Sequence, residues 1–411
     1  MRKLRLSLFC SAAAIALAVP ALGADPIKLE VANSWTSGGE AAAKQVIIDA
    51  LAAKGIAWVD SSIAGFESAN AAFNSRLMAG NPPPAKAAIA GLDQSEVIGQ
   101  GLMTDIDATA KAAGVSSALP KLLLNNITFD GKIYEAPIEF HGESMYFYSM
   151  PVFAKVGIAA PPKTWDEMFA DLDKVKAAGL VPVAWSGQGW QVVKTFNTIL
   201  LSVIGTDGFN KVYTDKDEAT VRSPGFAKAV EIFNKLHGYI PAGSENLNWN
   251  DATAMVITGK AALQFEGDWA KGEFTNAKQV AGKDYGCEFA PGSDGTIIIS
   301  DVFAFPKVKD ADQQKAQQIF AETVFDPKVQ VAFSLKKGSF PVRADVDTSS
   351  LDVCAQKDVV MVKAGKVAPE QAIVLTPAQN GTLTDLISQY FAAPTATAAF
   401  VDSFAAMLKN A

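Results

Sequence analysis

Histidine is scarce in this sequence: His141 and His237 are the only two among 411 residues. The chain also contains no Gly-x-Ser-x-Gly elbow, no His-Glu-x-x-His helix and no P-loop. These absences argue against serine hydrolases, zinc proteases and P-loop nucleotide hydrolases. Glu139 and Glu143 offer a pair of carboxylates of the kind that a glycosidase uses, so a glycosidase stays open as an alternative. We expect no enzyme activity, no catalytic residues and no cofactor.

Clusters of basic residues are also missing. Asp and Glu number 43 against 36 Lys and Arg, which gives a formal net charge of −7. Proteins that bind nucleic acid or anionic membranes concentrate positive charge in order to neutralise phosphate groups. We therefore expect no nucleic-acid partner and no tight binding to a membrane surface.

Long hydrophobic runs occur only at the N-terminus. The sequence begins MRKLRLSLFCSAAAIALAVPALGAD, with three basic residues, an apolar run from Leu6 to Leu22 and a small-x-small cleavage site at Ala21 and Gly23. The run is short for a membrane-spanning helix, and the pattern is that of a secretory signal peptide. We predict cleavage after residues 1–23 and a periplasmic mature protein, with an uncleaved anchor as the alternative. Cleavage would change the net charge from −7 to −10.

Cysteine is nearly absent from the rest of the chain, where only Cys287 and Cys354 occur. Two such cysteines in an oxidising compartment usually form a disulfide. The bond would close a loop of about 67 residues and stabilise the fold by roughly 4 kcal/mol in the chain-entropy model. Two unpaired buried thiols are the alternative. The wide separation does not match the ligand spacing of a metal site, and we expect no metal.

Hydrophobic periodicity predicts alternating strands and helices after the leader. Residues 27–33 alternate as a strand does, and apolar residues at helical spacing follow up to Gly55. A strand over 56–62, a helix over 66–79 and a short buried strand over 87–92 come next. This order is typical of a parallel sheet with helices on its faces.

A second region of the same kind begins near residue 130. It contains a capping box, Thr164 followed by Glu167, at the start of a predicted helix. A β-branched strand at 296–307 and a helix at 312–325 lie further along. Because 411 residues are many for one domain, we predict an α/β fold with two lobes and several crossings between them.

Tryptophans recur beside carboxylates, amides and glycines. Gln188 lies in WSGQGW, Trp249 lies in NLNWND, and Asp268 precedes Trp269. A sugar has apolar C–H faces, which suit indole rings, and a rim of hydroxyl groups, which suits carboxylates and amides. One tryptophan alone more often packs in a core. Several of them next to polar residues at predicted strand ends favour a crevice that binds a ligand.

The stretch SWTSGGE, residues 34–40, is interpreted as one wall of that crevice. Trp35 would offer a ring face, and Thr36 and Ser37 would offer hydroxyl groups. The two glycines would let the backbone approach the ligand without a Cβ in the way. Glu40 falls in the first turn of a helix, where the helix dipole favours negative charge, and it would accept hydrogen bonds from two ligand hydroxyls.

Six motifs give the chain a resemblance to a known family: SWTSGGEAAA, NPP, YEAPIEFH, ATAMVITGKAALQFEGDWAKGEFT, SDVFAF and KGSFPVR. In this order they resemble carbohydrate-binding proteins of bacterial ABC importers, an extracellular solute-binding family, and most of all its periplasmic glucose-binding proteins. The resemblance implies the two-lobed periplasmic-binding-protein fold with three hinge crossings. We predict an N-terminal lobe of residues 24–134 plus 300–349 and a C-terminal lobe of 135–299 plus 350–411. We expect a monomer that binds a small sugar or polyol and docks on the permease subunits of an ABC transporter.

The resemblance also implies ligand contacts at individual positions. The acid of the family's first loop corresponds to Glu40 and the second ring of that loop to Trp35, whereas Ser34 replaces the first ring. Ala90 replaces a common lysine, and Glu266 stands where an apolar residue is usual. The complete set of predicted ligand-binding residues is Trp35, Thr36, Ser37, Glu40, His141, Gln188, Trp249, Glu266, Asp268, Trp269, Asp301, Lys337 and Gln379.

These departures from the family pattern bear on the ligand. They remove a stacking ring and cationic donors from the predicted cleft, so glucose itself is not carried over. Acids without basic counterweights favour a cation, and an amino sugar or other cationic polyol stays open as an alternative to a neutral hexose or polyol. A ferric-ion binder would need a cluster of tyrosinates, and only Tyr146 and Tyr148 come near. A binding protein that serves a chemoreceptor stays open as well.

Overall fold

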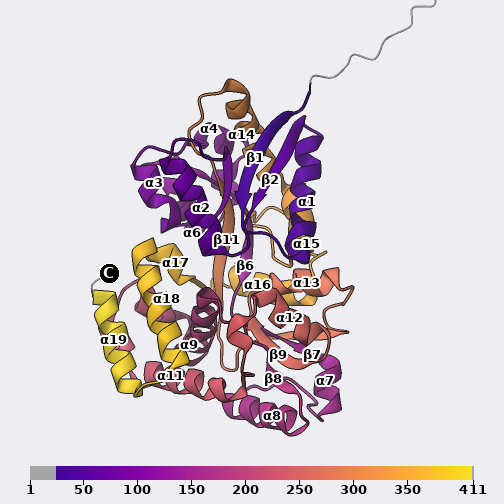
Figure 1. The fold of residues 1–411 in the computed structure, drawn as a ribbon, viewed down its shortest axis with the longest axis vertical. Helices are drawn as coiled ribbons and strands as arrows, with labels where there is room; N and C mark the ends of the chain where they lie inside the picture. Colours follow the sequence, from indigo (N-terminus) through magenta and orange to yellow (C-terminus); the bar gives the residue numbers. More distant parts are fainter. Residues whose placement is uncertain (1–24, 410–411) are drawn as a thin grey trace, which may run out of the picture.

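The computed structural model describes residues 25–409 and shows two lobes, one above the other in Figure 1. Each lobe has its own β-sheet with helices packed around it. The predicted leader, residues 1–23, lies outside the described residues. Within them, none of the helices combines the length and the hydropathy needed to span a bilayer.

The first lobe begins with the predicted β-α-β-α-β order. β1 (Ile27–Asn33) lies between β2 (Ile56–Ser62) and β3 (Ala85–Ile89), and both pairings are parallel. α1 (Gly38–Ala52) and α2 (Phe66–Met78) connect these strands. Parallel neighbours require a crossover of this kind, which places the helices against the faces of the sheet.

Shorter elements complete the first lobe. Those that follow β3 are η1 (Leu92–Gln94), α3 (Ser95–Gly99), α4 (Asp107–Ala112), α5 (Val115–Ala118), α6 (Lys121–Asn126), β4 (Thr128–Phe129) and β5 (Lys132–Ile133). Two helices from much later in the chain, α14 (Ala311–Val324) and α15 (Pro327–Lys337), pack on α1. The side chains of Asp310 and Asp326 cap these two helices by accepting hydrogen bonds from backbone N–H groups of the first turn.

The second lobe is built on a four-stranded sheet with the order β10-β7-β9-β8. Its strands are β7 (Met145–Ser149), β8 (Val181–Val183), β9 (Ala261–Glu266) and β10 (Tyr285–Phe289). Its helices are α7 (Met150–Lys155), α8 (Trp165–Ala177), α9 (Gly189–Tyr213), α10 (Glu218–Val221), α11 (Pro224–Leu236), η2 (His237–Tyr239), η3 (Ser244–Asn246), α12 (Trp249–Ile257), α13 (Ala270–Asn276), α18 (Pro377–Ala392) and α19 (Thr397–Lys409). The predicted capping box is present at the start of α8, where Thr164 and Glu167 exchange hydrogen bonds.

Aromatic side chains fill the core of the second lobe. Phe196 of α9 is fully buried, and its ring centroid lies 5.3 Å from that of Phe233 in α11 and 5.8 Å from that of Phe400 in α19. Burial of one such side chain contributes roughly 1.5–3 kcal/mol. This packing fixes α9, the helix that carries part of the site described below.

Two long antiparallel strands connect the lobes. β6 (Glu135–Gly142) leads from the first lobe into β7, and β11 (Thr296–Ala304) returns from β10 to pair with both β6 and β3. Both strands lie in the middle of the molecule in Figure 1. A third connection runs from α15 to α16 (Val353–Lys363), after which come β12 (Val367–Pro369) and α17 (Gln371–Val374). The predicted two-lobed α/β fold with several crossings is confirmed, whereas the exact lobe boundaries stay predictions.

The predicted disulfide is present. Cys287 of β10 is bonded to Cys354 of α16, and both residues are buried. The alternative of two free thiols is therefore wrong. The bond fastens the end of the third connection to the sheet of the second lobe.

Candidate ligand-binding site

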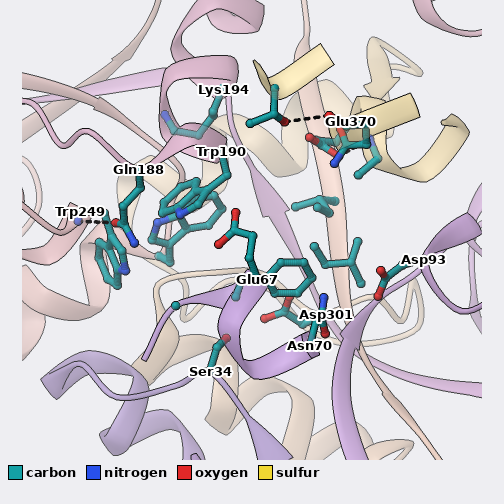
Figure 2. A pocket seen from close by; sticks show the side chains of 18 of the residues that line it. Ser34, Glu67, Asn70, Asp93, Gln188, Trp190, Lys194, Trp249, Asp301 and Glu370 are labelled. Carbon is teal, nitrogen blue, oxygen red and sulfur yellow. Dashed lines mark hydrogen bonds between the residues drawn. The ribbon is translucent and has the colours of Figure 1, made fainter. Parts of the chain in front are cut away.

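A cavity of about 720 Å³ lies between the two lobes. Its walls come from both of them: the loop before α1, the start of α2 and residues after β3 on one side, and α9, α12, α17 and α18 on the other. A volume of several hundred cubic ångströms is typical of small-molecule sites. Figure 2 shows Trp190 and Trp249 at one end of this cavity and Asp93 and Glu370 at the other.

Most of the residues predicted from the sequence meet at this cavity. The predicted residues on its wall are Trp35, Thr36, Ser37, Glu40, His141, Gln188, Trp249, Trp269, Asp301 and Lys337. The predicted residues that are not on its wall are Glu266, Asp268 and Gln379. The side chains of these three residues make contacts within the protein instead, which are described below.

The loop before α1 is held by the side chain of Glu40. Its Oε2 accepts hydrogen bonds from the backbone N–H groups of Thr36 and Ser37, both at 2.9 Å, and Ser37 Oγ accepts one from the N–H of Glu40. One carboxylate oxygen therefore shapes the loop, and only the other is free of loop contacts. Glu40 was predicted to accept hydrogen bonds from two ligand hydroxyls, but only one of its carboxylate oxygens is not already used by the loop.

The reason predicted for the two glycines of this loop is wrong. Gly38 and Gly39 are not on the cavity wall. A Cβ at Gly39 would lie 2.6 Å from the carbonyl carbon of Gly272, and a Cβ at Gly38 would lie within contact of Asn276. Both of those residues belong to α13 in the other lobe. The glycines therefore allow two helices to approach each other rather than a ligand to approach the backbone.

Trp35 contributes less ring surface than the sequence pattern suggests. Its side chain is 4% exposed and packs against Phe303 and Phe333, with centroid distances of 5.7 Å and 5.5 Å. The Nζ of Lys337 lies 5.1 Å from the ring centroid, a cation–π distance. Trp35 thus belongs mainly to the core of the first lobe and reaches the cavity only with part of its ring.

Three half-buried tryptophans of the second lobe offer more ring surface. They are Trp190 in α9, Trp249 at the start of α12, and Trp269 just before α13. Trp190 and Trp269 meet edge to face with centroids 5.8 Å apart. The backbone N–H of Trp249 donates to Gln188 Oε1 at 2.8 Å, which joins two predicted residues (Figure 2). Trp190 was missing from the predicted set, although the WSGQGW motif contains it.

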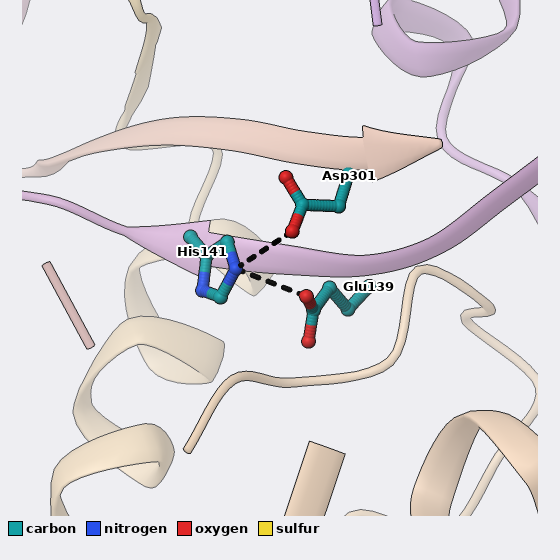
Figure 3. A group of neighbouring side chains, drawn as sticks. All are labelled: Glu139, His141 and Asp301. Carbon is teal, nitrogen blue, oxygen red and sulfur yellow. Dashed lines mark ion pairs between the residues drawn. The ribbon is translucent and has the colours of Figure 1, made fainter. Parts of the chain in front are cut away.

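His141 of β6 is the centre of a buried group of charges (Figure 3). Its Nε2 lies 3.0 Å from Glu139 Oε1 and 3.5 Å from Asp301 Oδ2, at ion-pair distances, and its Nδ1 donates to Asp268. Burial alone would lower the pKa of His141, but Glu139 and Asp268 outweigh it and raise the pKa well above the usual value. The surrounding acids therefore favour the imidazolium form of His141.

Asp268 positions this imidazolium instead of facing the cavity. Its side chain is fully buried, and its second oxygen accepts a hydrogen bond from the backbone N–H of Gly142 at 3.1 Å. Both carboxylate oxygens are thus used within the protein. Asp268 therefore orients His141, which itself reaches the cavity.

Asp301 and Lys337 form the part of this group that faces the cavity. Asp301 Oδ2 lies 3.6 Å from Lys337 Nζ, and the Asp301 side chain keeps 18% of its surface exposed. Burial tends to raise the pKa of Asp301, but Lys337 and His141 hold it well below its usual range. Asp301 is therefore an ionised acceptor at the cavity wall.

Glu139, His141 and Asp301 are spaced closely enough for a metal ion, since their ligand atoms lie within 4.8 Å of one another (Figure 3). Two observations do not fit a metal. The acids around His141 favour its imidazolium form, in which the nitrogen that would bind the ion carries a proton, and the ammonium of Lys337 lies beside Asp301. The group is better described as an ion-pair network in which the positive charges are already present.

Glu266 is turned away from the cavity towards Lys194. Its side chain is fully buried, Oε1 lies 3.5 Å from Lys194 Nζ, and Oε2 accepts a hydrogen bond from Gln264 at 2.9 Å. Lys194 of α9 lies on the cavity wall but was not predicted. A lone lysine within the apolar helix sequence QVVKTFNTILL is the signal that could have identified it.

Gln379 completes the capping box of α18. Its Oε1 accepts a hydrogen bond from the backbone N–H of Thr376 at 2.9 Å. The next residue, Asn380, and Thr384 one turn later lie on the cavity wall instead. The prediction therefore differs from the structure by one residue, because the helical phase of α18 turns Asn380 rather than Gln379 towards the cavity.

The sequence was also compared with known proteins. The profile of a family described as bacterial extracellular solute-binding protein matches residues 34–331, which is more than half of the chain. The chain belongs to this family. The solute-binding protein is 36% identical over 398 residues to a "Probable sugar-binding periplasmic protein" of Mesorhizobium japonicum, covering 96% of this chain and 92% of the relative.

Further relatives agree with this assignment. A protein of the same description from Rhizobium meliloti is 37% identical over 334 residues, with 80% of each chain covered. Among solved structures, a "Chitin oligosaccharide binding protein" matches with a TM-score of 0.78 and 20% identity, over 94% of this chain and 99% of the other. The structural match supports the two-lobed fold of this solute-binding protein.

Proposed function

We propose that this chain is the periplasmic solute-binding protein of an ABC sugar importer. It captures a monosaccharide or related polyol between its lobes and delivers it, as a monomer, to the permease in the membrane. The observation that carries this proposal is the cavity wall, in which three half-buried tryptophans of the second lobe accompany the ionised Asp301 and Lys337 between the lobes. Indole rings suit the C–H faces of a sugar and the ionised side chains suit its hydroxyl groups. The names of the relatives support the same ligand class.

The placement of Glu139 weighs against the glycosidase alternative. Its carboxylate is fully buried beside His141, accepts a hydrogen bond from Ser339, and is not on the cavity wall, where Glu143 is. The two acids therefore do not flank a common space for a glycosidic bond. Binding, rather than hydrolysis, is the function that this arrangement supports.

The tyrosines weigh against the ferric-ion alternative. Tyr146 is fully buried, and burial raises the pKa of its hydroxyl group, so tyrosinate is disfavoured there. Neither Tyr146 nor Tyr148 lies on the cavity wall. Service to a chemoreceptor would use the same closed form of the protein and stays compatible with the proposal.

The mechanism is closure around the ligand. A sugar that contacts both lobes binds the closed arrangement more tightly than the open one, and this difference shifts the population towards closure. The closed form would then present a defined surface to the permease.

A thermal-shift panel tests this function directly. Ligand binding to the folded state must raise the melting temperature, because it stabilises that state by about 2.7 kcal/mol when the ligand concentration is one hundred times Kd. The purified chain without residues 1–23 is heated with neutral hexoses, pentoses, polyols and amino sugars, each in a separate sample. We expect at least one of them to raise Tm in a concentration-dependent way. If the whole panel leaves Tm unchanged, the proposed function is wrong.

A further inference from the structure

Two carboxylates on the cavity wall have no cationic partner of their own. Glu143, just after β6, is 6% exposed, and its carboxylate accepts no hydrogen bond from any residue between 25 and 409. Glu370, just after β12, is 7% exposed, and its Oε2 accepts one from the backbone N–H of Ala372 at 2.7 Å. Both carboxylates are therefore almost completely removed from water and open only to the cavity.

The nearest cation is already paired. Lys194 Nζ lies 3.5 Å from Glu266 Oε1, and Glu266 is fully buried. Glu266, Glu143 and Glu370 together carry three carboxyl groups, against one ammonium group. Burying a charge without a partner is costly, so ionising Glu143 and Glu370 beside the cavity is unfavourable until a cation reaches them.

The same imbalance holds over the whole wall. The acids that line it are Glu40, Glu67, Asp93, Glu96, Glu143, Asp301, Glu370 and Asp385. The cationic side chains that line it are His141, Lys194 and Lys337. Lys337 and His141 are engaged with Asp301, which leaves acids from both lobes facing the space for the ligand. A cleft of this charge concentrates cations.

We propose that the ligand is a sugar that carries an ammonium group, and that Glu143 and Glu370 hold this group. This inference rests on the proposed function and narrows its ligand class to amino sugars. The ammonium group would donate hydrogen bonds to both carboxylates and supply the missing positive charge. The tryptophans at the other end of the cavity would contact the apolar faces of the sugar (Figure 2).

The titration of this pair provides a distinctive signature. Burial raises the pKa of Glu143, and the neighbouring Glu370 raises it further, while Lys194 and His141 lower it and Glu266 raises it. Burial also raises the pKa of Glu370, to about 7. Glu370 is therefore protonated well below pH 7, and it then no longer attracts an ammonium group.

The first experiment measures preference by isothermal titration calorimetry at pH 7.0. The purified chain without residues 1–23 is titrated with D-glucosamine, D-galactosamine and D-mannosamine, each beside its parent hexose and its N-acetyl derivative. We expect one amino sugar to bind at least tenfold more tightly than both of its uncharged counterparts. A neutral hexose that binds as tightly as its amino sugar overturns the inference and leaves the proposed function standing. Absence of binding by every sugar overturns both.

The second experiment tests the residues. Glu143→Gln and Glu370→Gln keep the shape of the side chain and remove its charge, and each should reduce the preference for the amino sugar over its parent hexose by at least tenfold. The matched control is Glu322→Gln on the exposed surface of α14, which should keep the full preference. An unchanged preference in both cavity variants refutes the assignment.

The third measurement needs no variant and covers the case in which a substitution impairs folding. At pH 5.5 the preference of the unmodified protein for the amino sugar should fall at least fivefold, while the affinity for the parent hexose stays within twofold. A preference that is the same at pH 7.0 and pH 5.5 contradicts recognition by these two carboxylates.

Discussion

At the scale of single residues, His141 is surrounded by three carboxylates. It lies among the carboxylates of Glu139, Asp268 and Asp301, all within ion-pair distance. Removing one partner from a buried ion pair costs about 3–5 kcal/mol, because the remaining charge is left buried alone. We therefore predict that His141→Gln lowers the free energy of unfolding by about that amount, measured by urea titration at pH 7. His237→Gln, at the exposed second histidine, is the control and should change it by less than about 1 kcal/mol.

The tryptophans give a second prediction at this scale, because Trp190 and Trp35 line the same cavity from different surroundings. Trp190 is half-buried, whereas Trp35 is 4% exposed among Phe303 and Phe333. We predict that Trp190→Ala weakens sugar binding by about 1–3 kcal/mol, since it removes a contact surface for the ligand. Trp35→Ala should destabilise the fold by about 3–5 kcal/mol, since it leaves a cavity in a packed core.

Calorimetric affinity and urea unfolding, measured on both variants, separate the two effects. If Trp190→Ala binds the sugar as tightly as the unmodified chain does, that ring is not part of the ligand contact. If Trp35→Ala unfolds at the same urea concentration as the unmodified chain, the ring is not a core element.

The residue scale also shows what the sequence could and could not predict about the site. Residue type beside a strand end was enough to bring Trp269 to the cavity, because Trp269 follows β9 and strand ends gather at one edge of a sheet. Asp301 reaches the cavity from inside β11 instead, next to a shift in the register between β11 and β6. Residue type was not enough for Glu266 or Gln379. Packing against other elements decides to which side of β9 Glu266 points and which face of α18 Gln379 occupies. This packing cannot be predicted from the local sequence pattern.

At the scale of elements, α1 and α13 meet closely across the two lobes. The N–H of Gly39 donates to Glu273 Oε1 at 2.7 Å, and a Cβ at Gly39 would lie 2.6 Å from a backbone atom of Gly272. A backbone atom cannot move aside as the end of a flexible side chain can. We predict that Gly39→Ala lowers the free energy of unfolding by about 1–3 kcal/mol, as overpacking does, measured by urea titration.

The matched control for this substitution is Gly99→Ala at the end of α3. A Cβ there has no heavy atom within 4 Å, so the change should be close to zero or slightly stabilising. Equal stability of Gly39→Ala and Gly99→Ala would show that the α1–α13 contact adapts without cost.

The elements themselves were largely predictable, but their pairing was not. Alternation and helical spacing predicted β1, α1, β2, α2 and β3, since each is a local pattern of apolar side chains. The pairing of β6 with β11 joins segments about 160 residues apart, for example His141 with Ile299. Only the resemblance to a known family implied crossings at such positions, because local periodicity says nothing about which distant strand becomes a neighbour.

At the scale of the whole molecule, buried acids make stability depend on pH. Burial raises the pKa of Asp358 and of Glu370 to about 7 each, and it also raises the pKa of Glu139 and Glu266. A folded-state pKa above the unfolded value means that folding favours the protonated form, so Asp358 and Glu370 contribute stability that is lost as the pH rises through about 7. The raised pKa values of Glu139 and Glu266 act in the same direction. His141 acts in the same direction, because its raised pKa gives stability that is complete below about 6.5 and is lost at higher pH.

Acids with lowered pKa values act elsewhere on the pH scale. The pKa of Asp60 is lowered to about 2, and that of Asp301 is lowered as well. Their contribution is present above the unfolded value of about 3.9 and is lost only below it. Between pH 8 and pH 5.5, therefore, the groups with raised pKa values decide whether the free energy of unfolding rises or falls with pH.

We predict that the ligand-free protein gains about 1–3 kcal/mol of unfolding free energy when the pH falls from 8 to 5.5. Urea titrations at both values measure this gain, and Glu370→Gln should reduce it, because that variant has no carboxyl group to titrate at this position. Glu322→Gln, at an exposed site, should keep the full gain. A protein that is less stable at pH 5.5 would contradict the assignment of these buried acids. The expected gain also matters for the amino-sugar proposal, since weaker ligand binding at pH 5.5 cannot then be the result of a less stable fold.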